Sequence, residues 1–190
     1  YGDKNEKAKQ AAESAMASIV PLFPPEAAAE LLDVLYGVIM SSTAKWQAKV
    51  GALKIIGRLA DLAYEQVGDE LTQMTPVLTQ AMHETKAEVS KQAIKTATKV
   101  CGVIDNNDIR PFIPDLVGCM ARPDSVPACI KKLSSITFVA EVTGPALAVM
   151  VPLLSRALNE RSQTVQRQSV IIVDNLCKLV RDPHTAALYL

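Results

Sequence analysis

Apolar residues recur along the chain at the spacing of helices. Val50, Leu53, Ile56 and Leu59 fall on one face of a helix, because positions three and four apart share a face. Residues 89–100 show the same spacing. The pattern predicts amphipathic α-helices along the chain.

The tripeptide Pro-x-Leu occurs three times inside apolar stretches. It stands at Pro76–Leu78, Pro114–Leu116 and Pro152–Leu154, so each copy follows the last by 38 residues. A short polar turn and a second amphipathic stretch follow each copy. The spacing predicts a helix-turn-helix unit with a proline inside its first helix, which bends that helix. A period of about 40 residues is typical of HEAT repeats, and tetratricopeptide and ankyrin units are shorter.

We therefore predict an all-α fold, a HEAT-repeat α-solenoid of about four to five helix pairs. It is expected to form a single domain over residues 1–190, with partial repeats at both ends. The charged helical pattern at the start and the open end suggest a fragment of a longer chain. The expected repeats span about 25–62, 67–104, 107–142 and 144–181.

The composition agrees with closely packed helices. Hydrophobic residues make up 49% of the chain and aromatic residues only 4%, and small aliphatic side chains suit helices better than β-sandwiches. The four cysteines form no CxxC pair, which predicts reduced thiols and no disulfide frame or zinc site. No signal peptide and no apolar run of about 20 residues is apparent. The cysteines are Cys101, Cys119, Cys129 and Cys177.

We find no pattern of catalytic residues. The sequence has no phosphate-binding loop of the GxxxxGK[ST] or GxGxxG type. His83 and His184 fall in different repeats, and His83 beside Glu84 is typical of a surface residue at a helix end. No nucleophile is placed next to a base by its spacing. We expect no enzymatic activity, no metal and no cofactor in this chain.

The formal net charge of zero hides a segregation of charge between helical layers. The second helices, taken as 44–60, 85–104, 125–142 and 161–181, carry 14 of the 20 basic residues and three of the 20 acidic ones. In solenoids of this class the second helices line the concave face, so we expect a basic surface for an anionic partner there. RNA and an acidic protein both fit, and lysines chosen for solubility are the alternative. Because aromatic residues are few, RNA would be bound through its phosphates.

The basic residues of this layer form stripes along single helices. Lys91, Lys95 and Lys99 recur every four residues, and Lys45 and Lys49 make a second stripe with Lys54 and Arg58 nearby. The candidate contacts with RNA or the ribosome are Lys45, Lys49, Lys86, Lys91, Lys95, Lys99, Arg122, Lys131, Lys132, Arg161 and Arg167.

Polar residues interrupt two apolar stretches that we predict as helical. Glu141 interrupts ITFVAEVTGP, and Asp174 with Asn175 interrupts VIIVDNLCKLV. Buried polar groups need hydrogen-bond partners. We therefore predict that Asp174 and Asn175 bond the backbone of an adjacent turn and hold the repeats together. Trp46, which opens a second helix, is interpreted as a packing residue.

Longer strings carry a resemblance to a known family. SITFVAEVTGPALAVMVPLLSRALNER and VIIVDNLCKLVRDP closely resemble the HEAT domain of the fungal translation elongation factor three family. KWQAKVGAL, MHETKAEVSKQA and DNNDIRPFIPDLVGCMARP fit the same domain in order. The resemblance covers about residues 20–185. The first 20 residues match loosely, and the middle repeats diverge enough to suggest a paralogue.

The resemblance implies a function. Members of that family are ABC-F ATPases that act on the ribosome, so this chain would dock the ATPase on the small subunit, through its RNA and proteins, in the cytoplasm. ATP and Mg would belong to cassettes outside this chain. Paralogues act in mRNA export or in general-control stress signalling, so a protein-interaction scaffold with an acidic protein partner is the alternative. We expect neither a membrane nor DNA as a partner.

Overall fold

The computed structural model describes residues 5–189, which form helices and the segments that join them. Within that range there are eleven α-helices, four short 3-10 helices and no β-strand. The predicted all-α, HEAT-type fold class is confirmed. The chain divides into two compact units, Tyr1–Val103 and Ile104–Leu190, which are described separately. The grouping of the helices into four repeats of a single domain stays a prediction.

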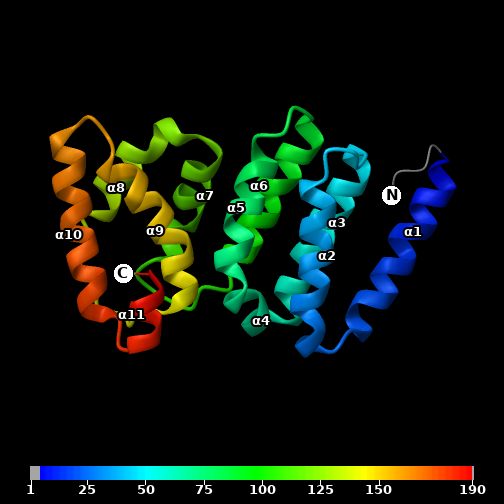
Figure 1. Ribbon diagram of the computed structural model, residues 1–190, viewed down its shortest axis with the longest axis horizontal. Coiled ribbons are helices and arrows are strands. Elements are labelled where there is room, and N and C mark those ends of the chain that lie inside the picture. The colour runs from blue at the N-terminus through cyan, green and yellow to red at the C-terminus, as the bar shows by residue number, and fades with distance from the viewer. Residues whose placement is uncertain (1–4, 190) are drawn as a thin grey trace. The chain divides into compact units, whose positions relative to one another are not determined.

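The first unit is built from paired antiparallel helices and shorter connecting ones. Helix α2 packs against α3 and α5, and α6 packs against both α3 and α5 (Figure 1). The short helix α4 joins α3 to α5 and contacts both. The elements are α1 (Glu6–Ile19), η1 (Val20–Leu22), η2 (Pro25–Ala27), α2 (Ala28–Met40), α3 (Trp46–Leu62), α4 (Tyr64–Asp69), α5 (Leu71–Met82) and α6 (Ala87–Cys101).

One face of α6 is entirely buried in this unit. Val89, Ala93 and Ala97 have no exposed surface, as the helical spacing predicts. The hydroxyl of Thr96 donates a hydrogen bond to the carbonyl oxygen of Leu53 at 2.9 Å, which joins α6 to α3. Full burial of a valine side chain such as that of Val89 contributes roughly 1.5–3 kcal/mol, and the methyl group of an alanine contributes less. The opposite face of α6 is left to solvent.

The second unit holds the remaining helices. Helix α7 packs against α8 and α9, α10 packs against α8 and α9, and α11 packs against α9. The elements are η3 (Arg110–Phe112), α7 (Ile113–Ala121), η4 (Pro123–Ser125), α8 (Val126–Leu133), α9 (Gly144–Leu158), α10 (Gln163–Leu179) and α11 (Pro183–Tyr189).

The prolines of the repeat do not all lie inside a helix. Pro76 lies within α5 and Pro152 within α9, as predicted. Pro114 instead lies in the first turn of α7, so the prediction is wrong for the third unit. There the 3-10 helix η3 directly precedes α7. A proline is well tolerated in a first turn because the N–H that it lacks would have no partner there.

Helix α8 is shorter than predicted, because a polar clamp holds the segment that follows it in a non-helical form. The helix ends at Leu133 and residues 134–143 are not helical. The Oδ2 atom of Asp108 accepts hydrogen bonds from the backbone N–H groups of Val139 and Ala140 at 2.7 and 2.8 Å. The side-chain amide of Asn106 donates to the carbonyl oxygen of Glu141 at 3.0 Å.

The predicted roles of Glu141, Asp174 and Asn175 change accordingly. Glu141 does not lie in a helix, and its exposed side chain is 3.4 Å from the guanidinium of Arg181. Asp174 is exposed and pairs with Lys178 on its own helix, so the prediction that it bonds an adjacent turn is wrong. Asn175 is half-buried, and no hydrogen bond of its side chain is recorded within residues 5–189.

Asn106 is a buried polar residue that was not predicted from the sequence. It is 2% exposed, and its Oδ1 atom accepts from the backbone N–H groups of Asp108 and Ile109 at 3.0 Å each. All the polar atoms of this side chain therefore have partners. Asn106 and Asp108 together connect the turn after α6 to the segment after α8.

The carboxylates of Glu70 and Asp33 lie near the buried hydroxyl of Tyr36. That hydroxyl has no hydrogen-bond partner among the described residues. Burial raises the pKa of Tyr36, and the charges of Glu70 and Asp33 raise it further. Burial also raises the pKa of Glu70, with the like charges of Asp33 and Asp69 adding to the effect. Ionised Glu70 is therefore a source of instability in this unit.

We expect Asn106→Ala to lower the free energy of unfolding by roughly 1–3 kcal/mol, because it leaves buried backbone groups without partners. Chemical denaturation would measure the change. Asn159→Ala is the matched control, since Asn159 is exposed and makes one bond to the carbonyl of Ser155. Its effect should stay within about 0.5 kcal/mol. Equal effects of the two substitutions would contradict the clamp.

We expect Glu70→Gln to raise the melting temperature at pH 7. The folded-state pKa of Glu70 lies above the ordinary value of 4.5, so its ionisation costs stability at pH 7. The gain should shrink as the pH falls through the raised folded-state pKa and should vanish below 4.5, where both states hold the proton. Melting curves at several pH values would test this, with exposed Glu26→Gln as the control. A gain independent of pH would contradict the electrostatic cause.

Candidate functional site

The clearest cluster of accessible basic residues lies on α6. Lys91 and Lys95 are exposed on the face opposite the buried one, and Lys86 is exposed at the N-cap position. No ion pair of these three lysines is recorded within residues 5–189. Lys99 is also exposed but is ion-paired with Asp61 at the end of α3. The predicted stripe on α6 thus exists, and an acid neutralises its last member.

Lys49 cannot serve as the surface contact that we predicted. Only 8% of the residue is exposed, and its ammonium group pairs with the carboxylate of Glu84 in the turn between α5 and α6. Buried lysines are rare unless they are paired. The helical pattern alone assigned Lys49 to the solvent face, because its partner comes 35 residues later in the chain. Its role is structural.

The other basic residues of α3 differ in their surroundings. Lys45 is exposed at the N-cap position of α3. Lys54 is exposed and its ammonium group lies 2.7 Å from the Oε1 atom of Glu13 on α1. Trp46, the first residue of α3, is half-buried.

In the second unit, α8 and α10 carry three of the predicted residues. Lys131 and Arg167 are exposed, and no ion pair of either is recorded in the described part of the chain. Lys132 is exposed, and its Nζ atom lies 2.8 Å from Asp115 on α7. The hydrogen bond to that carboxylate raises the pKa of Lys132.

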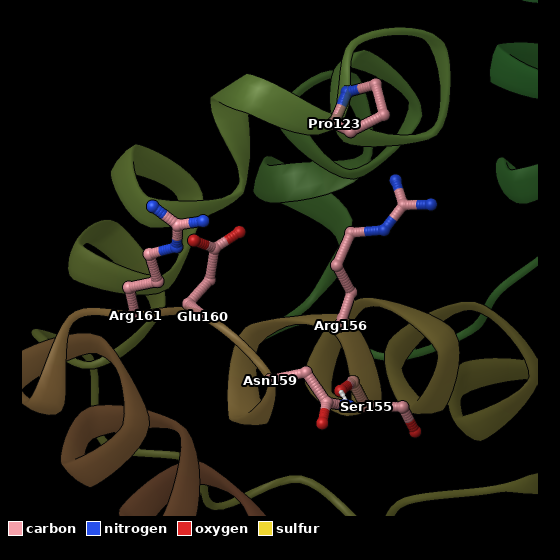
Figure 2. Close-up of a pocket in the computed structure, with 6 residues that line it drawn as sticks. All are labelled: Pro123, Ser155, Arg156, Asn159, Glu160 and Arg161. Carbon is pink, nitrogen blue, oxygen red and sulfur yellow. Dashed lines mark hydrogen bonds between the residues drawn. The ribbon is translucent and has the colours of Figure 1, made fainter.

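A second basic site lies where α9 ends and α10 begins. Arg156, in the last turn of α9, and Arg161, in the turn that follows, line an open depression of about 730 Å³. Figure 2 shows Arg156 extended towards Pro123, and Arg161 beside Glu160. Exposed Arg122 immediately precedes Pro123. Of the predicted residues, Arg161 therefore lines this depression, and Arg122 adjoins it in sequence through Pro123.

Arg156 was not among the residues predicted from the sequence. A basic residue in the last turn of a helix is favoured by the helix dipole, and its position in LLSRALNER was the available signal. The depression carries two arginines and one glutamate, so it is mildly basic. It could accept a single anionic group at its open side.

The described residues contain neither a cluster suited to a metal ion nor a candidate membrane-spanning helix. Between residues 5 and 189, no three His, Cys, Asp or Glu side chains are grouped so as to hold a metal ion. No helix in the same range is both long enough and apolar enough to cross a membrane. His83 and His184 are exposed, and the cysteines are free, with Cys101, Cys119 and Cys129 buried and Cys177 exposed.

We expect Lys49→Met to lower the free energy of unfolding by roughly 1–3 kcal/mol, because Glu84 loses the partner of its half-buried carboxylate. Adding Glu84→Gln should recover part of the loss. Lys91→Met, at an exposed lysine on α6, is the matched control and should change stability by no more than about 0.5 kcal/mol. If Lys49→Met is as mild as the control, the ion pair does not stabilise the fold.

Two family models match this chain. The model described as EF3 N-terminal HEAT repeat matches residues 1–97. The model described as Elongation factor 3/GNC1 HEAT repeat matches residues 124–190. Together they account for most of both compact units.

Curated relatives align over the whole chain. It is 44% identical to mRNA export factor elf1 of Schizosaccharomyces pombe over 191 residues. It is 44% identical to Elongation factor 3 of Phytophthora infestans and 42% identical to Elongation factor 3A of Saccharomyces cerevisiae, over 189 residues each. Each alignment covers 100% of this chain and 18% of the relative, so the chain spans less than a fifth of these proteins. The chain belongs to the elongation factor 3 family and represents its HEAT-repeat region.

Proposed function

We propose that this chain is a ribosome-docking scaffold of an ABC-F translation factor of the elongation factor 3 type. Its helices would hold the ATPase on the small ribosomal subunit, in the cytoplasm, through contacts with ribosomal RNA and proteins. Relatives named elongation factor 3 support a role in translation. Because the chain spans 18% of these relatives, the activity and partners of the whole protein belong to this proposal.

The observation that carries the proposal is the outer face of α6. It presents Lys86, Lys91 and Lys95 to solvent with no recorded ion pair, while its acidic residue, Glu88, lies in the first turn. Lys91 and Lys95 are one helical turn apart and therefore lie on the same side. A row of uncompensated ammonium groups attracts a polyanion and releases the ions condensed on it.

The same face favours phosphate contacts over contacts with bases. No aromatic residue occurs on α6, so no ring is available there to stack on an unpaired base. Lysine is a flexible point charge that suits a phosphate backbone. RNA binding at α6 would therefore position the scaffold on the ribosome without reading a sequence.

A scaffold used in mRNA export is the second candidate function. It is favoured by the relative named mRNA export factor elf1, which is 44% identical over the whole chain. In that case the same lysines would contact an acidic protein or an RNA that is not ribosomal. Purified ribosomes separate the two candidates, because only the first requires direct ribosome binding.

We expect Lys91→Gln with Lys95→Gln to weaken co-sedimentation with purified ribosomes. For the unsubstituted chain, binding should fall steeply with salt concentration, since each contacted phosphate releases counterions. Removing two phosphate contacts should reduce the slope of log K against log salt by about two. Co-sedimentation at several salt concentrations would measure both quantities.

The control is Arg110→Gln with Lys178→Gln, which removes the same charge from exposed residues of the second unit, outside the candidate surface. Circular dichroism would verify that both variants are folded. Equal binding by the α6 variant and the control would place the docking surface elsewhere. No binding of the unsubstituted chain to ribosomes at low salt would rule out the docking proposal itself.

A further inference from the structure

A basic pocket lies inside the first unit, between α1, α3 and α6. Its volume is about 280 Å³, which is room for several water molecules or a phosphate group. Helix α3 contributes Lys54 and Arg58, α6 contributes Lys95 and Lys99, and α1 contributes Glu13. Four cationic groups and one carboxylate thus line the pocket, and one of the four, Lys99, is already paired with Asp61 outside the lining.

Arg58 is the unusual member of this pocket. Its Nη1 atom is buried and has no hydrogen-bond partner among the described residues. Buried polar atoms almost always have a partner, and a charged donor without one costs free energy. Gly57, beside Arg58 in the pocket lining, brings no side chain to fill the space. Arg58 therefore lines the pocket and carries one charged donor that is not used within the described residues.

Glu13 occupies the place of an anionic ligand. Its carboxylate accepts a hydrogen bond from Lys54 at 2.7 Å. That bond and the charge of Lys54 lower the pKa of Glu13, and Arg58 adds a smaller contribution. Both partners of this pair are more than 40% exposed, so the pair is weak and opens easily.

Helix α1 is loosely attached around this ion pair. None of its residues is buried, so little apolar surface holds it against α3. Helices of this kind depend on packing for their stability. Displacing Glu13 from the pocket would therefore disturb little of the core.

We propose that this pocket binds a backbone phosphate of RNA, and that Glu13 is an internal competitor which the phosphate displaces. The inference rests on the proposed function, because it takes RNA as the partner. The phosphate would accept hydrogen bonds from Arg58 and Lys54 in place of the Glu13 carboxylate. Arginine suits this role because its planar guanidinium can donate two parallel hydrogen bonds to a phosphate.

The position of the pocket favours an RNA strand over an isolated anion. Lys95 lines the pocket and also belongs to the exposed row of α6, where Lys91 lies one turn away. A strand with one phosphate in the pocket can continue along that row. A single small anion would use only the pocket.

The test measures binding of a fluorescently labelled short uridine oligonucleotide to the 190-residue chain by anisotropy. Glu13→Gln should tighten binding by up to about fivefold, since it removes an exposed competing ion pair. Arg58→Gln should weaken binding by about tenfold or more, and Arg58→Lys by less. Inorganic phosphate should compete with the oligonucleotide better than chloride at equal ionic strength.

Matched controls exclude a general effect of charge. Glu6→Gln removes another carboxylate of α1 that is paired with a lysine, and Arg110→Gln removes an exposed arginine of the second unit. Neither should change binding by more than about twofold. Circular dichroism would show that each variant is folded, and Arg58→Lys covers the case in which Arg58→Gln is not.

The outcomes separate this inference from the proposed function. If Glu13→Gln and folded Arg58 variants behave like their controls, the pocket proposal is overturned, although the lysines of α6 can still bind ribosomes. If these variants act on the oligonucleotide but the chain does not sediment with ribosomes, the phosphate pocket stands and ribosome docking fails. Competition by an acidic peptide but not by phosphate would assign the pocket to a protein partner and overturn the proposal.

Discussion

The packing of α6 against α3 and α5 is the constraint on which the charged surface of the first unit depends. A helix of a repeat protein buries its apolar face only against its neighbours, and here the face of α6 with Ala93 and Ala97 has no exposed surface. Small side chains let the helices approach closely, and the bond from Thr96 to the carbonyl of Leu53 joins α6 to α3. Once that face is fixed, Lys91 and Lys95 can only point to solvent. The basic surface is thus a consequence of packing that the apolar pattern determines.

Periodicity was sufficient to predict the helices, because it reports which residues share a face. The apolar spacing of α6 and the prolines inside α5 and α9 were predicted from the sequence and are found in the structure. The apolar periodicity did not predict the backbone conformation where side chains from distant segments determine it. Residues 134–143 look helical in sequence, yet Asp108 binds the N–H groups of Val139 and Ala140. Those partners lie 31 and 32 residues away, so no local pattern reveals them.

In the candidate site, too, a local sequence pattern does not reveal partners that are distant in the chain. The sequence identified a basic layer, and Lys91 and Lys95 are exposed as a solvent-facing stripe requires. The sequence pattern could not show which lysines are already paired with a carboxylate. Lys49 pairs with Glu84 and Lys99 with Asp61, at separations of 35 and 38 residues. The separation of Lys99 from Asp61 equals the repeat spacing, whereas in the other pair the lysine comes first and the separation is shorter. Both pairs join different helices, so the pattern of a single helix does not predict them.

Burial decides which of these ion pairs can be exchanged for a partner. The side chain of Lys49 is 10% exposed, so opening its pair would leave a charge in a poorly solvated place. Lys54 and Lys99 are 43% and 42% exposed, so water can replace a carboxylate at little cost. Binding of a phosphate at these two lysines is then an exchange of one anion for another. Such an exchange gains less free energy than contact with an unpaired ammonium group. Polyanions in general therefore bind these two lysines weakly. Strong binding at the pocket consequently requires an anion that also satisfies Arg58, and this requirement turns a general basic surface into a selective one.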